Sequence, residues 1–156
     1  MKTITIFSDT HGNKTLLKKC QQICNECDLI LHAGDGNCDV FSIDGAYEKA
    51  IIVDGNCDGG FAGCHEQIIE IEQKRILLTH GHLFGVKTSL KSLVAYAKSK
   101  ECNVVVYGHN HKMRVEEIDG VLTINPGTLS RTSAYKSFCY LVINQSKAVA
   151  TLREIY

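Results

Sequence analysis

Short apolar runs, separated by polar turns that often contain glycine, repeat along this chain and predict a mixed α/β fold. Runs that are brief and rich in Val and Ile predict buried strands. The strands expected on this basis are residues 2–7, 28–33, 50–53, 103–107, 138–144 and 148–155. Two more pairs of runs predict hairpins. One joins 67–72 to 75–79 through Gln73-Lys74, and the other joins 113–118 to 121–125 through Asp119-Gly120, a strong two-residue turn signal.

Apolar residues at helical spacing predict two amphipathic helices. The first runs from Lys14 to about Cys27 and the second from Val86 to Lys100, with a further short helix expected around Tyr47. Strands with intervening helices, followed by a strand-rich second half, fit two packed sheets with helices on the outside. With 156 residues and no visible linker, the chain is expected to form one domain, residues 1–156.

The charge balance narrows the choice of partners. Seventeen basic and 17 acidic residues cancel, so a long nucleic acid is disfavoured as an obligate partner, although a local basic patch stays open. The apolar N-terminal run is too short for a signal peptide, and no apolar stretch reaches the roughly 20 residues of a membrane span. A cytoplasmic location without membrane contact is therefore expected.

Eight cysteines raise the question of disulfides or zinc. Without a secretory signal a disulfide framework is a weak reading. Cys20, Cys24 and Cys27 share the apolar face of the first predicted helix and are interpreted as small core residues. The alternative, a zinc site at Cys24-x-x-Cys27, lacks a second pair at matching spacing.

Polar side chains that bind metals follow several predicted strands directly. These residues are Asp9, Asp35, Asn56, His80 and His109. Because sites in α/β folds gather beyond the carboxyl ends of strands, side chains so far apart in sequence can converge. Asp9-x-His11 and His109-x-His111 each place two donors on one side of an extended backbone. Oxygen and nitrogen donors suit Mn, Fe, Zn or Ni.

Each of these segments also has an ordinary explanation. Asp9 could cap the helix that follows, and Asp35 and Asp54 lie in glycine turns that favour Asp. The histidine pairs could be loop residues. The metal-site hypothesis is favoured because all five segments would need separate ordinary explanations at once.

Four further polar residues could belong to a site or to the scaffold around it. Asn37 competes with Asn56, but the strand 50–53 ahead of Asn56 favours the latter. His65 is expected at the surface, and His32 as a packed histidine or a supporting donor. Arg131 could reach a substrate phosphate, although a solvated loop position is the usual place for Arg.

A charge count points to an anionic substrate. Two divalent cations bring four positive charges, and Asp9, Asp35 and a bridging hydroxide would remove three. The remaining positive charge would attract a phosphate and stabilise the charge that grows in its transition state. The cations would also supply hydroxide near neutral pH, so no protein nucleophile is needed.

The clusters taken in order resemble a known family. Asp9-x-His11, Gly34-Asp35, Gly55-Asn56-x-Asp58, Thr79-His80-Gly81-His82 and Gly108-His109-x-His111 resemble the motifs of the calcineurin-like metallophosphoesterase superfamily. Residues 31–35, 82–85 and 125–128 extend the resemblance to its small prokaryotic phosphodiesterase branch. The resemblance implies a four-layer αββα sandwich of two mixed sheets and hydrolysis of phosphodiesters or small phosphomonoesters. It also makes a homodimer plausible.

The resemblance further implies the ligands of two cations that share Asp35. One cation would be held by Asp9, His11, Asp35 and His111, and the other by Asp35, Asn56, His80 and His109. Mn²⁺ is the metal implied first, with Ni²⁺, Zn²⁺ or Fe as alternatives. Catalysis would be attack by a hydroxide that bridges the cations, with Asp35 and Asn56 in the catalytic set.

One position departs from the wider superfamily. Many members follow the ligand Asn with a His that contacts phosphate, whereas this chain has Cys57. A thiol is a poor replacement as proton donor. The hypothesis is that His82 or a metal-bound water protonates the leaving group.

A non-catalytic alternative comes from eukaryotic relatives that use this fold as a retromer subunit. Loss of a ligand would favour that reading, but all seven positions carry competent side chains. A nuclease that acts on polynucleotides would need a basic groove, and the balanced number of acidic and basic residues does not indicate one.

Overall fold

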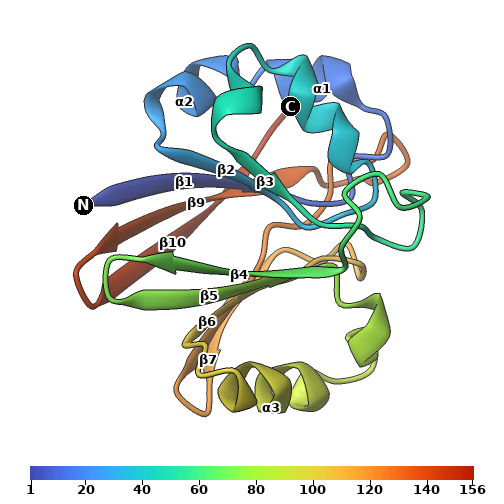
Figure 1. The fold of residues 1–156 in the computed structure, drawn as a ribbon. Helices are drawn as coiled ribbons and strands as arrows, with labels where there is room; N and C mark the ends of the chain where they lie inside the picture. The colour runs from blue at the N-terminus through green and yellow to red at the C-terminus, as the bar shows by residue number, and fades with distance from the viewer.

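Two five-stranded sheets pack face to face in the computed structural model, which describes residues 1–156 (Figure 1). The first sheet has the order β10-β9-β1-β2-β3, with bounds Lys147–Glu154, Ser137–Asn144, Lys2–Phe7, Leu29–His32 and Ala50–Ile52. The second has the order β4-β5-β6-β8-β7, with bounds Glu66–Ile71, Lys74–Thr79, Val104–Val106, Val121–Asn125 and Arg114–Ile118. Both sheets are mixed. β1, β2 and β3 are parallel to one another, as are β5, β6 and β8, and the remaining pairings are antiparallel.

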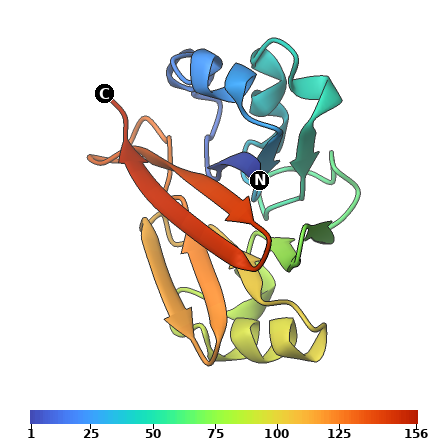
Figure 2. The same ribbon diagram turned by 90° about the vertical axis from the view of Figure 1, so that its left-hand side faces the viewer.

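Helices cover the outer face of each sheet and complete four layers (Figure 1 and, from the side, Figure 2). The first sheet carries α1 (Lys14–Lys18), α2 (Gln21–Glu26) and the 3₁₀ helices η1 (Asn37–Ser42) and η2 (Ala46–Glu48). The second carries α3 (Lys91–Ser99), and η3 (His82–Phe84) follows β5. None of these helices has the length and apolar content needed to cross a membrane. The predicted α/β sandwich is confirmed.

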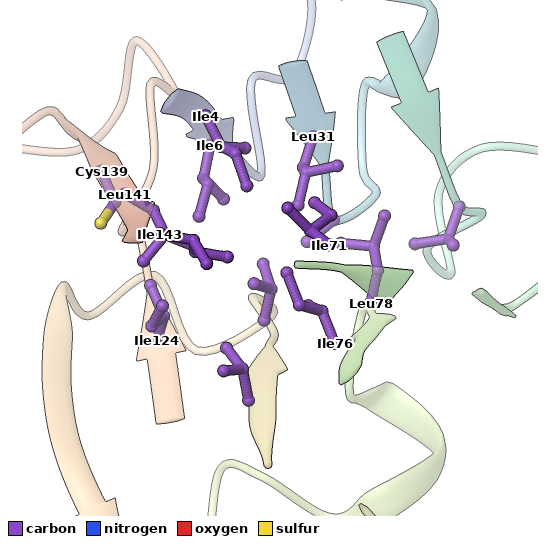
Figure 3. Close-up of a cluster of buried hydrophobic side chains, with 14 residues drawn as sticks. Ile4, Ile6, Leu31, Ile71, Ile76, Leu78, Ile124, Cys139, Leu141 and Ile143 are labelled. Atoms are coloured by element: carbon purple, nitrogen blue, oxygen red, sulfur yellow. The ribbon is translucent and has the colours of Figure 1, made fainter. Parts of the chain in front are cut away.

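Alternation along the strands divides apolar side chains between the layers. Ile4 and Ile6 of β1 point into the cluster between the sheets, whereas Phe7 packs among the helices outside (Figure 3 shows the inner cluster). In β5, Ile76 and Leu78 point inward and Leu77 faces α3. This period of two is what a strand buried on both faces requires, and it fixes the register of the sheets.

The predicted helix from Lys14 to Cys27 is wrong as one element, because it breaks into α1 and α2. The amide N–H groups of Lys19 and Cys20 bond to carbonyls three residues back, at Leu16 and Leu17, which tightens the chain and interrupts the α-helix. Cys20, Cys24 and Cys27 still lie buried against the first sheet. Their expected place in the core is confirmed.

Two other bounds differ from the prediction, and two short helices were not predicted. The first hairpin turns at Glu72 rather than at Lys74, because Glu72 adopts a left-handed conformation (φ 52°) and Lys74 already pairs with Ile71. The helix predicted from Val86 begins only at Lys91, since the amide groups of Thr88 and Ser89 both bond to the carbonyl of Gly85 in a turn. The 3₁₀ helices η1 and η3 were not predicted. They are short turns of the kind that follow a strand end and leave no apolar period.

Candidate metal centre

The loops that follow parallel strands meet at one end of the sandwich. Phe7 of β1 is level with His32 of β2, and Leu78 of β5 is level with Val106 of β6, so the strands of each sheet end together. Hydrogen bonds then join the two sheets. The amide of His109 donates to Asp9 Oδ2 at 3.0 Å, and His80 Nδ1 lies 2.7 Å from the carbonyl oxygen of Ala33.

Two glycines allow this convergence because there is no room for a side chain at either position. A Cβ on Gly108 would overlap the side chains of Ser8 and Asp9. A Cβ on Gly55 would overlap the backbone and carboxylate of Asp35. Gly108 therefore lets loops of the two sheets approach within contact distance, and Gly55 does the same for the loops after β2 and β3 of the first sheet.

One group of donors surrounds Asp9 Oδ1. His111 Nε2 lies 3.0 Å from this oxygen, and His11 Nε2 lies 3.7 Å from it. Single donor atoms from these three residues all lie within 4.8 Å of one another, which is close enough to share an ion. The structure thus places His111 beside Asp9 and His11, although they are about 100 residues apart in the sequence.

A second group surrounds Asp35. Its Oδ2 lies 3.2 Å from His80 Nε2, and Asp35, His80 and His109 form a second set within the same 4.8 Å limit. The same Oδ2 lies 4.0 Å from His11 Nε2, which belongs to the first group. Asp35 therefore lies between both groups, at the position that the family resemblance implies for a shared ligand.

Two buried polar atoms of this cluster have no hydrogen-bond partner. Asp9 Oδ1 and His80 Nε2 are buried, and although His111 Nε2 and Asp35 Oδ2 lie 3.0 and 3.2 Å from them, neither atom has a neighbour oriented for a hydrogen bond. The contact of His80 Nδ1 with the Ala33 carbonyl places the proton on Nδ1, so Nε2 presents a lone pair to the cluster. Unpaired lone pairs facing carboxylates are costly unless a cation lies between them. The residues present therefore fit divalent cations.

Backbone strain concentrates at the same residues. Nine non-glycine residues have positive φ, and five of them belong to this cluster: Asp9, His11, Asp35, His109 and His111, with φ between 44° and 70°. The left-handed conformation costs free energy for a residue with a Cβ, and it persists where the surrounding structure holds it. Such strain is typical of functional sites and favours a site over a set of unrelated turns.

Opposite charges determine the protonation of the first group. Burial raises the pKa of Asp9, but His11, His111 and His80 outweigh it and hold this pKa well below the ordinary value. The carboxylate of Asp9 in turn raises the pKa of His11. Asp9 is therefore an anion at neutral pH, as a metal ligand must be.

The other histidines differ in their surroundings. Burial lowers the pKa of His80, but Asp35 and Asp9 raise it by more. Burial lowers the pKa of His109, with the positive charges of His80 and Lys87 adding to the effect. Burial and the neighbouring His80 and His65 lower the pKa of His82. Metals bind the neutral form, so metal binding would release any proton held on a donor nitrogen of these rings.

The remaining predicted residues lie at the exposed rim. The amide nitrogen of Asn56 lies 3.4 Å from Cys57 Sγ, and the Cys57 amide donates to Asp35 Oδ1 at 2.8 Å. Cys57 Sγ also falls within 4.8 Å of donor atoms of His11 and Asp35. The ring of His82 lies 5.3 Å from that of His80. Asn37 is instead buried and bonds to Asp54 and the Val53 carbonyl, as a scaffold residue.

Two residues near the centre were given no role from the sequence, although His65 was expected at the surface and Asp58 belongs to the motif Gly55-Asn56-x-Asp58. The exposed ring of His65 lies 5.4 Å from that of His82, so it extends the histidine cluster outward. Asp58 accepts hydrogen bonds from four backbone amides, those of Asp35, Gly36, Asn37 and Gly55. The position of Asp58, three residues after Gly55, was the available signal, because Asp side chains commonly bond to nearby backbone amides in turns.

His32 is fully buried behind the cluster, as a supporting residue. Its Nδ1 accepts the amide proton of Gly34, and its Nε2 lies 3.0 Å from the hydroxyl of Thr10. Burial lowers the pKa of His32 from 6.5 to about 4. The folded protein therefore holds this imidazole neutral at neutral pH.

We expect the metal-free protein to lose stability as the pH falls from 6.5 toward 4, in part through His32. The unfolded chain takes up a proton there that the folded protein refuses, which costs up to about 1.4 kcal/mol per pH unit and about 3 kcal/mol in all. His32→Asn keeps an acceptor but cannot titrate. Urea unfolding across this pH range should give a flatter curve for the variant, and equal slopes would contradict the assignment.

Comparison with known proteins agrees with this fold. The sequence profile of the calcineurin-like phosphoesterase superfamily domain matches residues 1–148, so the chain belongs to this superfamily. A probable metallophosphoesterase of Bacillus subtilis strain 168, YsnB, is 33% identical over 96% of this chain and 88% of its own length. The predicted family is confirmed.

Two solved structures resemble the fold. A predicted phosphoesterase from Streptococcus pneumoniae TIGR4 has a TM-score of 0.82 and 24% identity, and covers 99% of this chain and 92% of its own. Vps29 from Entamoeba histolytica, complexed with Zn²⁺, has a TM-score of 0.77 and 19% identity, and covers 97% of this chain and 98% of its own. At this identity the likeness is one of fold.

Proposed function

We propose that this protein hydrolyses phosphate esters, phosphodiesters or small phosphomonoesters, with two divalent cations in the centre described above. The main support for this proposal is the pair of donor groups that meet at Asp35. Within them, Asp9 Oδ1 and His80 Nε2 have no hydrogen-bond partner. Asp9, His11, Asp35 and His111 would hold one cation, and Asp35, Asn56, His80 and His109 the other, with Mn²⁺ as the first choice. When bound, the cations supply a bridging hydroxide near neutral pH and stabilise charge on the phosphate.

The chain's own residues orient this chemistry. Asp58 fixes the backbone of Asp35, and the Cys57 amide fixes its Oδ1, so that Oδ2 faces the histidines. The Ala33 carbonyl holds the ring of His80 in one tautomer. A site held this rigidly needs little rearrangement during the reaction.

Proton donation to the leaving group would fall to His82. Burial and neighbouring positive charges lower its pKa, so its protonated form would depend on the negative charge of a bound phosphate. Burial, with Asp35 adding to it, raises the pKa of Cys57, which makes the free thiol a still weaker acid than usual. Esters with good leaving groups should therefore be turned over most readily.

His82→Ala is expected to slow an alkyl phosphate ester by about 10²-fold, because an alkoxide needs a proton as it leaves. A p-nitrophenyl ester should be affected much less, since its phenolate leaves unprotonated. Cys57→His should speed the alkyl ester. Parallel kcat measurements on both esters test this, and an alkyl rate that His82→Ala leaves unchanged would remove His82 from the mechanism.

A non-catalytic scaffold is the second candidate, in the manner of the protein-interaction relatives of this fold. Its support is the likeness to the vacuolar protein sorting protein Vps29. Because the Entamoeba protein is complexed with Zn²⁺, metal binding alone does not separate the two candidates. The complete donor set and the metallophosphoesterase relatives favour the enzyme.

Turnover of phosphate esters distinguishes the enzyme from the non-catalytic scaffold. The protein is stripped with a chelator, refilled with Mn²⁺, Ni²⁺ or Zn²⁺, and assayed with bis-p-nitrophenyl phosphate and p-nitrophenyl phosphate. We expect metal-dependent release of p-nitrophenolate. Activity that is absent with every metal would favour the scaffold. Gel filtration of the same samples tests the expected homodimer.

A further inference from the structure

A basic pocket opens beside the candidate metal centre. Its cavity of about 290 Å³ lies between the segment that leads into α3 and the loop that follows β6. The loop residue Asn110 lines it and stands between His109 and His111. The pocket and the centre therefore share one loop.

The lining carries a local excess of positive charge. Lys87, Lys91, Lys112 and Arg114 face a single carboxylate, that of Glu116. Glu116 already pairs with Arg114 at 2.8 Å, and none of the three lysines forms an ion pair. In a chain with no net charge, three unneutralised lysines around one cavity are complementary to an anion.

The start of α3 adds to this field. Helix N-termini are partially positive and usually carry acidic residues, which stabilise them. The first turn of α3 has no acidic residue, Lys91 is its first residue, and its amide donates to Ser89 Oγ at 3.2 Å. Thr88 and Ser89 bring hydroxyl groups to the same cavity. An anion bound here would neutralise part of the positive charge of both the helix N-terminus and the lysines.

We propose that this pocket binds a second phosphate group of the substrate. The physiological substrate is then a small phosphate ester with another phosphate besides the scissile one. This inference rests on the proposed function. A small molecule fits better than a long nucleic acid, because these four cations line a single cavity of about 290 Å³ in a chain with no net charge.

A matched pair of chromogenic esters tests the proposal. Thymidine 5′-(p-nitrophenyl phosphate) and its 3′-phosphate share the scissile bond and differ by one phosphate. The wild-type protein should prefer the 3′-phosphate by about tenfold in kcat/KM, as one contact between charged groups provides. The double variant Lys87→Gln/Lys91→Gln should reduce this preference to less than about twofold.

The control is Lys18→Gln/Lys147→Gln, which removes the same charge from exposed positions outside the pocket and should keep the preference. Lys112 is left intact because it adjoins His111. A wild-type protein without the preference, or a pocket variant that retains it, would overturn the proposal. Rates that rise with each added nucleotide in p-nitrophenyl esters of thymidine oligonucleotides would instead overturn the choice of a small substrate.

Calorimetric titration of the metal-free protein with inorganic pyrophosphate gives a readout that needs no turnover. The pocket variant should bind pyrophosphate about fivefold more weakly than the wild type, and the lysine control should bind it as the wild type does. If no ester reacts with any metal, the proposed function fails and this titration still decides on the pocket. Equal affinity in all three proteins would overturn it.

Discussion

Asp35→Asn is expected to abolish phosphoesterase activity, with a fall in kcat on the order of 10³-fold or more. The reason is that one carboxylate serves both donor groups. Its Oδ2 lies 3.2 Å from His80 Nε2 and 4.0 Å from His11 Nε2. An amide keeps the size of the side chain but removes the negative charge between the two cation positions, so both should lose affinity.

Metal content and turnover are measured on the same samples, by elemental analysis after dialysis and by release of p-nitrophenolate. Asp44→Asn is the matched control, because Asp44 is exposed between η1 and η2, and the variant should retain metal and activity. A metal-loaded Asp35→Asn protein with near wild-type turnover would show that Asp35 is no shared ligand.

The sheets and the convergence of the site were predictable from the chain. Alternation in Ile4, Ile6 and Phe7 sets which side of β1 faces each layer, and the same logic applies to β5. Asp9 and His80 each follow a strand end, in different sheets, and the packing of the two sheets brings His80 Nε2 to 3.9 Å from Asp9 Oδ1. Strand alternation and a polar residue directly after a strand are both local patterns, so they can be recognised in the sequence alone.

What could not be predicted depends on contacts between distant residues. The break between α1 and α2 follows from bonding at Lys19 and Cys20, where no glycine or proline announces it. His65 follows a glycine-rich loop, and only the fold brings its ring to His82. The basic pocket brings together lysines that precede and follow β6 in the sequence. The balanced overall charge gives no indication of this local excess.

Asp58→Asn should both destabilise the protein and weaken metal binding, although Asp58 belongs to neither donor group. Its Oδ1 accepts the amide protons of Gly36 and Asn37, and its Oδ2 those of Asp35 and Gly55, at distances from 2.7 to 3.1 Å. In Asn, one of these oxygens becomes an NH₂ group that faces two N–H donors. We expect a loss of about 3 kcal/mol in the free energy of unfolding of the metal-free protein.

The metal affinity should fall by about 10- to 100-fold, because Asp58 holds the left-handed backbone that aims the Asp35 carboxylate. Asp28→Asn is the control that separates the two effects. Asp28 accepts hydrogen bonds from the amide of Thr3 and from Lys2 before β2, at the opposite ends of the strands from the metal centre. Its loss should lower stability in urea and leave metal affinity unchanged. Asp58→Asn protein that binds metal as tightly as wild type would show that the loop orients Asp35 without this carboxylate.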